Sequence, residues 1–76
     1  MRITINSNGN EIKFSIYHKE KIQEEYLLRA TDAGGYSFYS ITPGLFRMIK
    51  EYSNHKRPLD VWRDVMEYIY HLARKY

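Results

Sequence analysis

The sequence predicts an α+β domain: a four-stranded antiparallel sheet made of two hairpins, followed by two C-terminal helices packed on one face. Two observations indicate the sheet. Apolar and polar residues alternate on both sides of Asn8-Gly9, and they alternate again on both sides of Gly34-Gly35. A third observation indicates helix, because apolar residues recur at helical spacing from Pro58 onward. Strands followed by helices are typical of the α+β class.

The first hairpin is predicted from residues 1–6 and 11–18. Asn-Gly between two alternating runs is a strong signal for a two-residue hairpin turn, here centred on Asn8-Gly9. That turn pairs apolar residues throughout: Ile5 with Ile12, Ile3 with Phe14, and Met1 with Ile16. Turn chemistry and alternation therefore predict the same buried face.

The second hairpin is predicted from residues 26–31 and 36–41, joined by a turn over 32–35, with 19–25 as a charged connector. An alternative makes 20–31 a helix capped by Gly34, which gives the element order ββαβαα. In that helix Leu27 and Leu28 would point to widely separated sides, leaving no clean apolar stripe. The alternation favours the hairpin.

A helix is predicted from Thr42 to Tyr52. Thr42 suits the N-cap and Pro43 the first helical position. Its apolar stripe consists of Leu45, Met48, Ile49 and Tyr52, with Phe46 at the edge.

The last helix is predicted from Pro58 to near the C-terminus. It carries acidic residues early and basic residues late, which complements the helix dipole. Its apolar half consists of Val61, Trp62, Val65, Met66, Ile69, Leu72, Ala73 and Tyr76.

Composition excludes several classes of protein. The 76 residues suffice for one domain, expected to cover 1–76, and 43% hydrophobic with 28% charged residues is ordinary globular usage. The chain has no cysteine, which excludes disulfides, a thiol nucleophile and cysteine-ligated metals, and which fits the cytoplasm. It shows no signal peptide and no apolar run long enough to cross a membrane.

Nothing in the sequence points to catalysis. Asp60, Asp64, Glu67 and His71 share one helical face, but that face lies opposite the apolar stripe and is expected to be solvated. The chain has no phosphate-binding glycine motif and no nucleophile elbow. We expect no enzyme activity, no cofactor, no metal site and no small-molecule substrate.

The sheet face away from the helices is the predicted partner-binding surface. Aromatic and apolar residues exposed beside basic ones are typical of an interface. The residues predicted there are Arg2, Lys13, Tyr17, Leu27, Arg29, Tyr36 and Phe38. The first interpretation is a partner protein or a second copy of the chain. The alternative is single-stranded nucleic acid, with bases stacked on the aromatics and phosphates on the basic residues. A third is that other parts of the chain cover the cluster.

The turn His55-Lys56-Arg57 is a further candidate, for contact with an anion, because it leads into a helix N-terminus. The net charge of +3 attracts an anionic partner only weakly. Size and architecture, by analogy alone, suggest a small regulator or inhibitor of the kind made by viruses and plasmids.

Overall fold

The computed structural model describes residues 1–42 and 45–76, and it has five strands and one helix. The elements are β1 (Arg2–Asn8), β2 (Glu11–His18), β3 (Lys21–Ala30), β4 (Tyr36–Ser40), β5 (Arg47–Tyr52) and α1 (Pro58–Ala73). The strands form one antiparallel meander in the order β1-β2-β3-β4-β5. The α+β class and the antiparallel sheet are confirmed.

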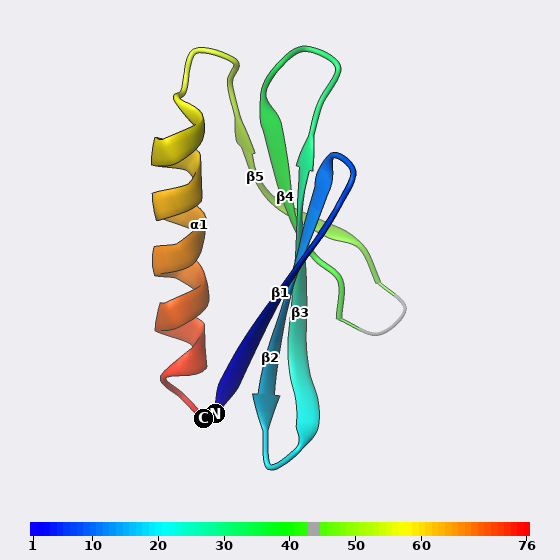
Figure 1. Cartoon of the computed structure of the whole chain (residues 1–76), viewed down its shortest axis with the longest axis vertical. Coiled ribbons are helices and arrows are strands. Elements are labelled where there is room, and N and C mark those ends of the chain that lie inside the picture. Colours follow the sequence, from blue (N-terminus) through cyan, green and yellow to red (C-terminus); the bar gives the residue numbers. More distant parts are fainter. Residues whose placement is uncertain (43–44) are drawn as a thin grey trace.

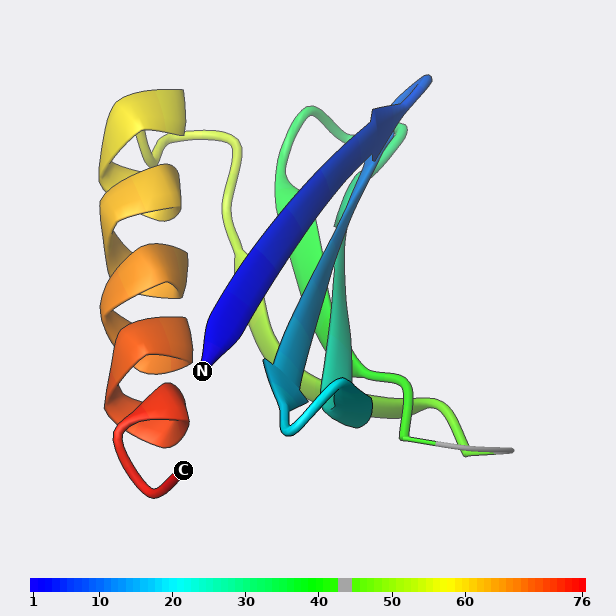
Figure 2. The ribbon, with the colours of Figure 1, turned by 60° about the horizontal axis from the view of Figure 1, so that its bottom comes forward.

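The helix α1 lies along one face of the twisted sheet, and both termini lie at the same end of the molecule (Figures 1 and 2). Between the two layers is the core. The sheet supplies Phe14, Ile16, Tyr26, Leu28, Phe38 and Tyr52, and the helix supplies Val61, Val65, Ile69 and Ala73. Trp62 packs against this core, with its ring centroid 5.7 Å from that of Phe14.

The first hairpin is confirmed, but its register is shifted by two residues. Asn8 pairs with Glu11, so the two turn residues are Gly9 and Asn10 rather than Asn8 and Gly9. Gly9 has φ of 63°, and the φ of Asn10 is not positive, which is the pattern of a turn with glycine in its first central position. Because the side-chain period in a strand is two, a two-residue shift leaves every side chain on its predicted face.

The charged segment 19–25 is a turn and a strand rather than a connector. β3 begins at Lys21, and Lys19-Glu20 alone joins it to β2. Both turn residues have positive φ, 53° and 66°, which hairpin geometry requires but neither residue favours. Residues 20–31 therefore do not form the alternative helix.

The helix predicted over Thr42–Tyr52 is wrong, and the described residues contain one helix where two were predicted. The described part of that segment contains β5, which pairs with β4 and adds a fifth strand; Pro43, the predicted first helical residue, lies outside the described residues. Short apolar runs fit helix and strand alike, and pairing along β4 decides between them. Tyr52 is buried in the core as a strand residue, whereas Leu45 and Met48 are exposed.

The last helix is confirmed over Pro58–Ala73. Pro58 occupies the start of the helix, and a basic His71 lies in the last turn. Within the described residues, no helix is both long and apolar enough to cross a bilayer.

Candidate functional site

The outer face of the sheet, which points away from α1, carries five of the seven predicted partner-binding residues. The register pairs Arg2 with Tyr17 and Lys13 with Leu27, and Arg29 with Ser37 on the same side. These positions alternate with the core residues, so their placement follows directly from the strand period. Leu27 is 7% exposed, and the other four are partly or largely exposed.

Tyr36 and Phe38 were predicted on this outer face, and that placement is wrong. Phe38 pairs with Leu28 and is only 1% exposed within the core, while Tyr36 pairs with Ala30 and packs against the core. The reason is the length of one loop. The predicted turn runs over 32–35, whereas the observed loop begins one residue earlier, at Thr31. A one-residue change in register exchanges the two faces of a strand.

Thr31 belongs to the loop because it closes it. Its backbone N–H donates to the Gly35 carbonyl at 2.9 Å, and its hydroxyl accepts from the Gly35 N–H at 3.2 Å. Gly34 makes the left-handed step at φ of 91°. Gly35 approaches the Tyr52 carbonyl so closely that a Cβ at this position would clash with it.

Apolar residues that the sequence did not assign to this face take the places of Tyr36 and Phe38. Tyr39 pairs with Leu27 on one side and with Met48 on the other, and its ring lies 5.9 Å from that of Phe46 in an edge-on arrangement. Phe46 is 64% exposed and Met48 is 48% exposed. We call Leu27, Tyr39, Phe46 and Met48 the outer-face patch. This patch was missed in the sequence because 42–52 was interpreted as a helix. Phe46 was placed at the edge of the apolar stripe of that helix.

The basic residues of the outer face are held by neighbours on the same face. Lys13 Nζ lies 2.9 Å from Glu25 Oε2, and Arg29 lies 3.0 Å from Glu11 Oε2. Arg29 also reaches over the Tyr39 ring at 5.7 Å, and Arg2 lies over the Tyr17 ring at 4.5 Å. These cations are therefore largely balanced by carboxylates or stacked on aromatics.

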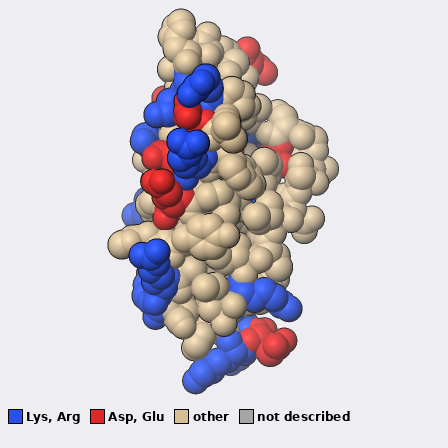
Figure 3. Space-filling view, turned by 60° about the vertical axis from the view of Figure 1, so that its left-hand side comes forward, with Lys and Arg blue, Asp and Glu red and all other residues tan. Residues whose placement is uncertain are grey.

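The outer face is also hollowed. A depression of about 490 Å³ lies beside the β1–β2 turn, lined by Asn6, Asn8, Glu11, Lys13 and Leu27 among others. Leu27 thus lines this polar depression and, paired with Tyr39, also belongs to the outer-face patch. The side that carries α1 looks different: basic and acidic side chains are interspersed along it rather than gathered by sign (Figure 3).

The turn His55-Lys56-Arg57 is exposed, as an anion-contacting turn must be. The Arg57 guanidinium is occupied by Asp60 at 3.0 Å, and no side chain caps the helix N-terminus. The hydrogen bond from Arg57 lowers the pKa of Asp60 below its usual value. Anion contact at this turn stays a prediction.

The acidic face of α1 was expected to be solvated, but Asp64 departs from this expectation. Asp64 faces β5, where it accepts hydrogen bonds from the Tyr52 hydroxyl and, at 3.0 Å, from Lys50. These two bonds, from Tyr52 first and then Lys50, lower the pKa of Asp64; burial and the Asp64 charge raise the pKa of Tyr52. Among the described residues, no group of three or more histidine or acidic side chains is placed to hold a metal ion.

The chain matches no protein-family model, and no curated protein or solved structure matches it significantly.

Proposed function

We propose that this protein is a non-enzymatic binding module that docks on another protein through the outer face of its sheet. The observation that carries the proposal is the outer-face patch, in which Phe46 and Met48 are exposed beside Tyr39. Exposed contiguous apolar groups on a folded domain mark contact surfaces. Aromatic residues, methionine and arginine are the residue types enriched at the centres of such interfaces.

The charges favour a protein partner over single-stranded nucleic acid. A phosphate backbone is bound through lysine and arginine side chains that are free to contact it. On this face Lys13 and Arg29 already pair with Glu25 and Glu11. A protein surface that buries the patch can leave these pairs intact at the rim, where they add specificity at little cost.

By its size and architecture, the module fits the role of a cytoplasmic regulator or inhibitor. It has no cysteine, as is common for proteins that work in a reducing compartment. Its partner is a different protein or a second copy of the chain, and sedimentation velocity of the chain alone distinguishes these two cases.

The test compares two matched pairs of substitutions. Phe46→Ser with Met48→Ser removes the exposed part of the patch; Leu59→Ser with Tyr70→Ser removes equally exposed apolar groups from α1. Sedimentation velocity of the unchanged chain reports self-association. Proteins of the source cell that bind the immobilised chain are then identified, purified and titrated individually. We expect at least a tenfold loss of affinity with the patch pair and little change with the α1 pair.

Two results would overturn the proposal. One is that the patch pair, with an unchanged circular dichroism spectrum, retains full affinity for every partner and for itself. The other is tight binding of single-stranded RNA or DNA that weakens steeply with salt, because that behaviour indicates phosphate contacts.

A further inference from the structure

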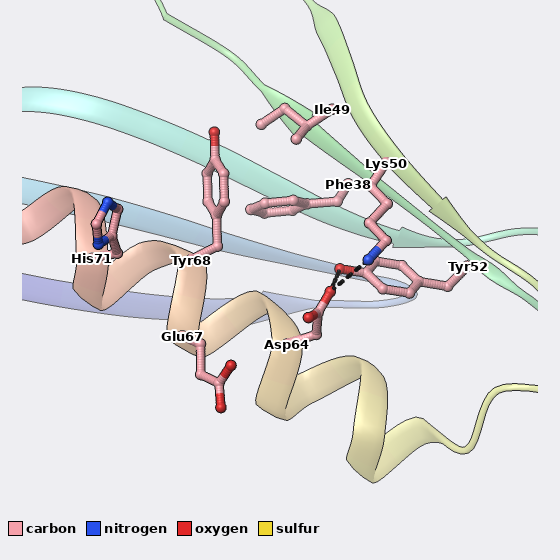
Figure 4. A pocket seen from close by; sticks show the side chains of 8 residues that line it. All are labelled: Phe38, Ile49, Lys50, Tyr52, Asp64, Glu67, Tyr68 and His71. Atoms are coloured by element: carbon pink, nitrogen blue, oxygen red, sulfur yellow. Dashed lines mark hydrogen bonds and ion pairs between the residues drawn. The ribbon is translucent and has the colours of Figure 1, made fainter.

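A second surface lies on the other side of the sheet, between β5 and α1. A groove of about 460 Å³ is lined by Phe38 and Ile49 from the sheet and by Tyr68 from the helix, with charged groups around them (Figure 4). Phe38 and Tyr68 meet edge-on with centroids 5.4 Å apart, and Tyr68 is 36% exposed. Tyr68 thus forms an aromatic wall that is partly open to solvent, backed by the buried ring of Phe38.

A β-bulge shapes this groove. Phe38 pairs with Lys50 but the next residue, Tyr39, pairs with Met48, so Ile49 is an extra residue in β5. In a regular strand, neighbouring side chains point to opposite faces. The bulge allows Ile49 and Lys50 to line the same groove, which is the re-aiming of a side chain for which bulges are commonly used.

The charges around the groove are unequal. Lys50 lies 3.0 Å from Asp64, which also accepts a hydrogen bond from the Tyr52 hydroxyl. At this end of the groove, the charges of Lys50 and Asp64 therefore neutralise each other. Figure 4 shows these bonds on one side of the groove, with Phe38, Ile49 and Tyr68 together on the other. Glu67 lies at the helical rim and forms no ion pair among the described residues. Glu67 is therefore the unpaired acidic group at this rim, where His71 also lines the groove.

The groove runs beside an open sheet edge. β5 is the last strand in the sheet order, so in the described part of the chain no strand pairs with its outer side. Extended peptides bind such edges by backbone hydrogen bonds and place alternate side chains into adjoining pockets. Because the bulge interrupts β5, we expect only part of the strand to take up these bonds.

We propose that this groove binds an extended segment of a partner protein, which inserts one large apolar side chain between Ile49 and Tyr68, above the buried Phe38, and sets a lysine or arginine near Glu67. The site is separated from the outer-face patch by the thickness of the sheet, and it does not depend on the function proposed for that patch.

The experiment uses a displayed library of random eight-residue peptides, selected on the full chain. We expect enriched peptides to carry a large apolar residue next to a basic one. The best of them is then synthesised with a fluorescent label. Replacing its apolar residue by alanine lowers affinity by at least about tenfold, without any change to the protein.

Glu67→Lys supplies the decisive variant, because Glu67 is exposed and its replacement spares the core. We expect a severalfold loss of affinity for the basic peptide, and selection on this variant to favour acidic peptides instead. Glu20→Lys, with the same charge change in the β2–β3 turn, is the control and retains the preference for basic peptides. Backbone amide signals of 47–52 and 64–71 shift on binding.

Three outcomes would overturn the inference: no peptide is enriched above the unselected library, the amide shifts fall on the outer face instead, or selection on Glu67→Lys still favours basic peptides. Phe46→Ser, outside β5, leaves affinity for the selected peptide unchanged, so failure at one surface is distinguishable from failure at the other.

Discussion

Tyr76, the last residue, donates a hydrogen bond to Glu24 at 2.7 Å across 52 positions of sequence. The other carboxylate oxygen of Glu24 accepts from the Tyr26 hydroxyl at 2.6 Å, and Lys75 Nζ lies 3.3 Å from the oxygen that Tyr76 contacts. Partial burial works to raise the pKa of Glu24, but the bonds from Tyr26, Tyr76 and Lys75 together lower it. Burial and Glu24 raise the pKa of Tyr26 in turn. One carboxylate of β3 therefore ties the end of the chain to the sheet.

Replacing Glu24 by glutamine tests this tie. The substitution keeps the shape of the side chain but removes the charge that strengthens its hydrogen bonds. We expect a loss of about 1–2 kcal/mol in the free energy of unfolding, measured by urea denaturation at neutral pH. Glu20→Gln, in an exposed turn, serves as the control and changes stability by less than about 0.5 kcal/mol.

The same carboxylate predicts a dependence of stability on pH. The pKa of Glu24 is lowered from 4.5 on folding, so the folded chain holds this proton more weakly than the unfolded chain. Its contribution is complete above pH 4.5 and is lost as the pH falls through the lower folded pKa. The difference in urea midpoint between the original chain and Glu24→Gln should narrow on acidification. A difference that stays constant well below this pH would contradict the assignment.

Two phenylalanines that are eight positions apart in the sequence should respond in opposite ways. Phe38→Ala empties a core position that is 1% exposed, and we expect a cost of about 3–5 kcal/mol, enough to unfold much of a domain of this size. Phe46→Ala removes a ring that is 64% exposed and should change stability by less than about 1 kcal/mol. Thermal unfolding followed by circular dichroism distinguishes them. Equal losses would mean that Phe46 is packed.

The β2–β3 turn is strained in a way that can be relieved. Lys19 and Glu20 both have positive φ, at 53° and 66°, where asparagine followed by glycine is preferred. Lys19→Asn with Glu20→Gly should raise the free energy of unfolding by about 1 kcal/mol. Urea denaturation of the two chains side by side measures the gain, and a destabilised variant would refute the strained geometry.

Gly35 tests the close approach of two loops. A methyl group at this position would clash with the Tyr52 carbonyl, and backbone cannot move aside as a flexible side chain does. Gly35→Ala should lower the free energy of unfolding by about 1–3 kcal/mol. Ala33→Ser, in the exposed part of the same loop, is the control and should be nearly neutral. A neutral Gly35→Ala would show that the loops lie further apart.

Local signals were sufficient where chemistry and periodicity agreed. The glycine near the first turn, the alternation of β1 and β2, and the amphipathic stripe from Pro58 predicted their elements and faces correctly. These local signals failed where the faces of a strand depended on whether a loop was one residue longer. Because Thr31 closes the β3–β4 loop, Phe38 lies in the core and Tyr39 on the outer face. This exchange of faces removed Tyr36 and Phe38 from the predicted site and placed Tyr39 there instead.

The sequence by itself determined the α+β class, the first hairpin, the last helix and the outward direction of Arg2, Lys13, Tyr17, Leu27 and Arg29, because these follow from periods of two and of about 3.6 residues. Only the tertiary structure decided that 47–52 is a strand. Its apolar spacing satisfies a helix as well, and the hydrogen bonds offered by β4 tip the balance. The same pairing creates both candidate surfaces, since β5 carries Met48 to the outer face and Ile49 to the groove.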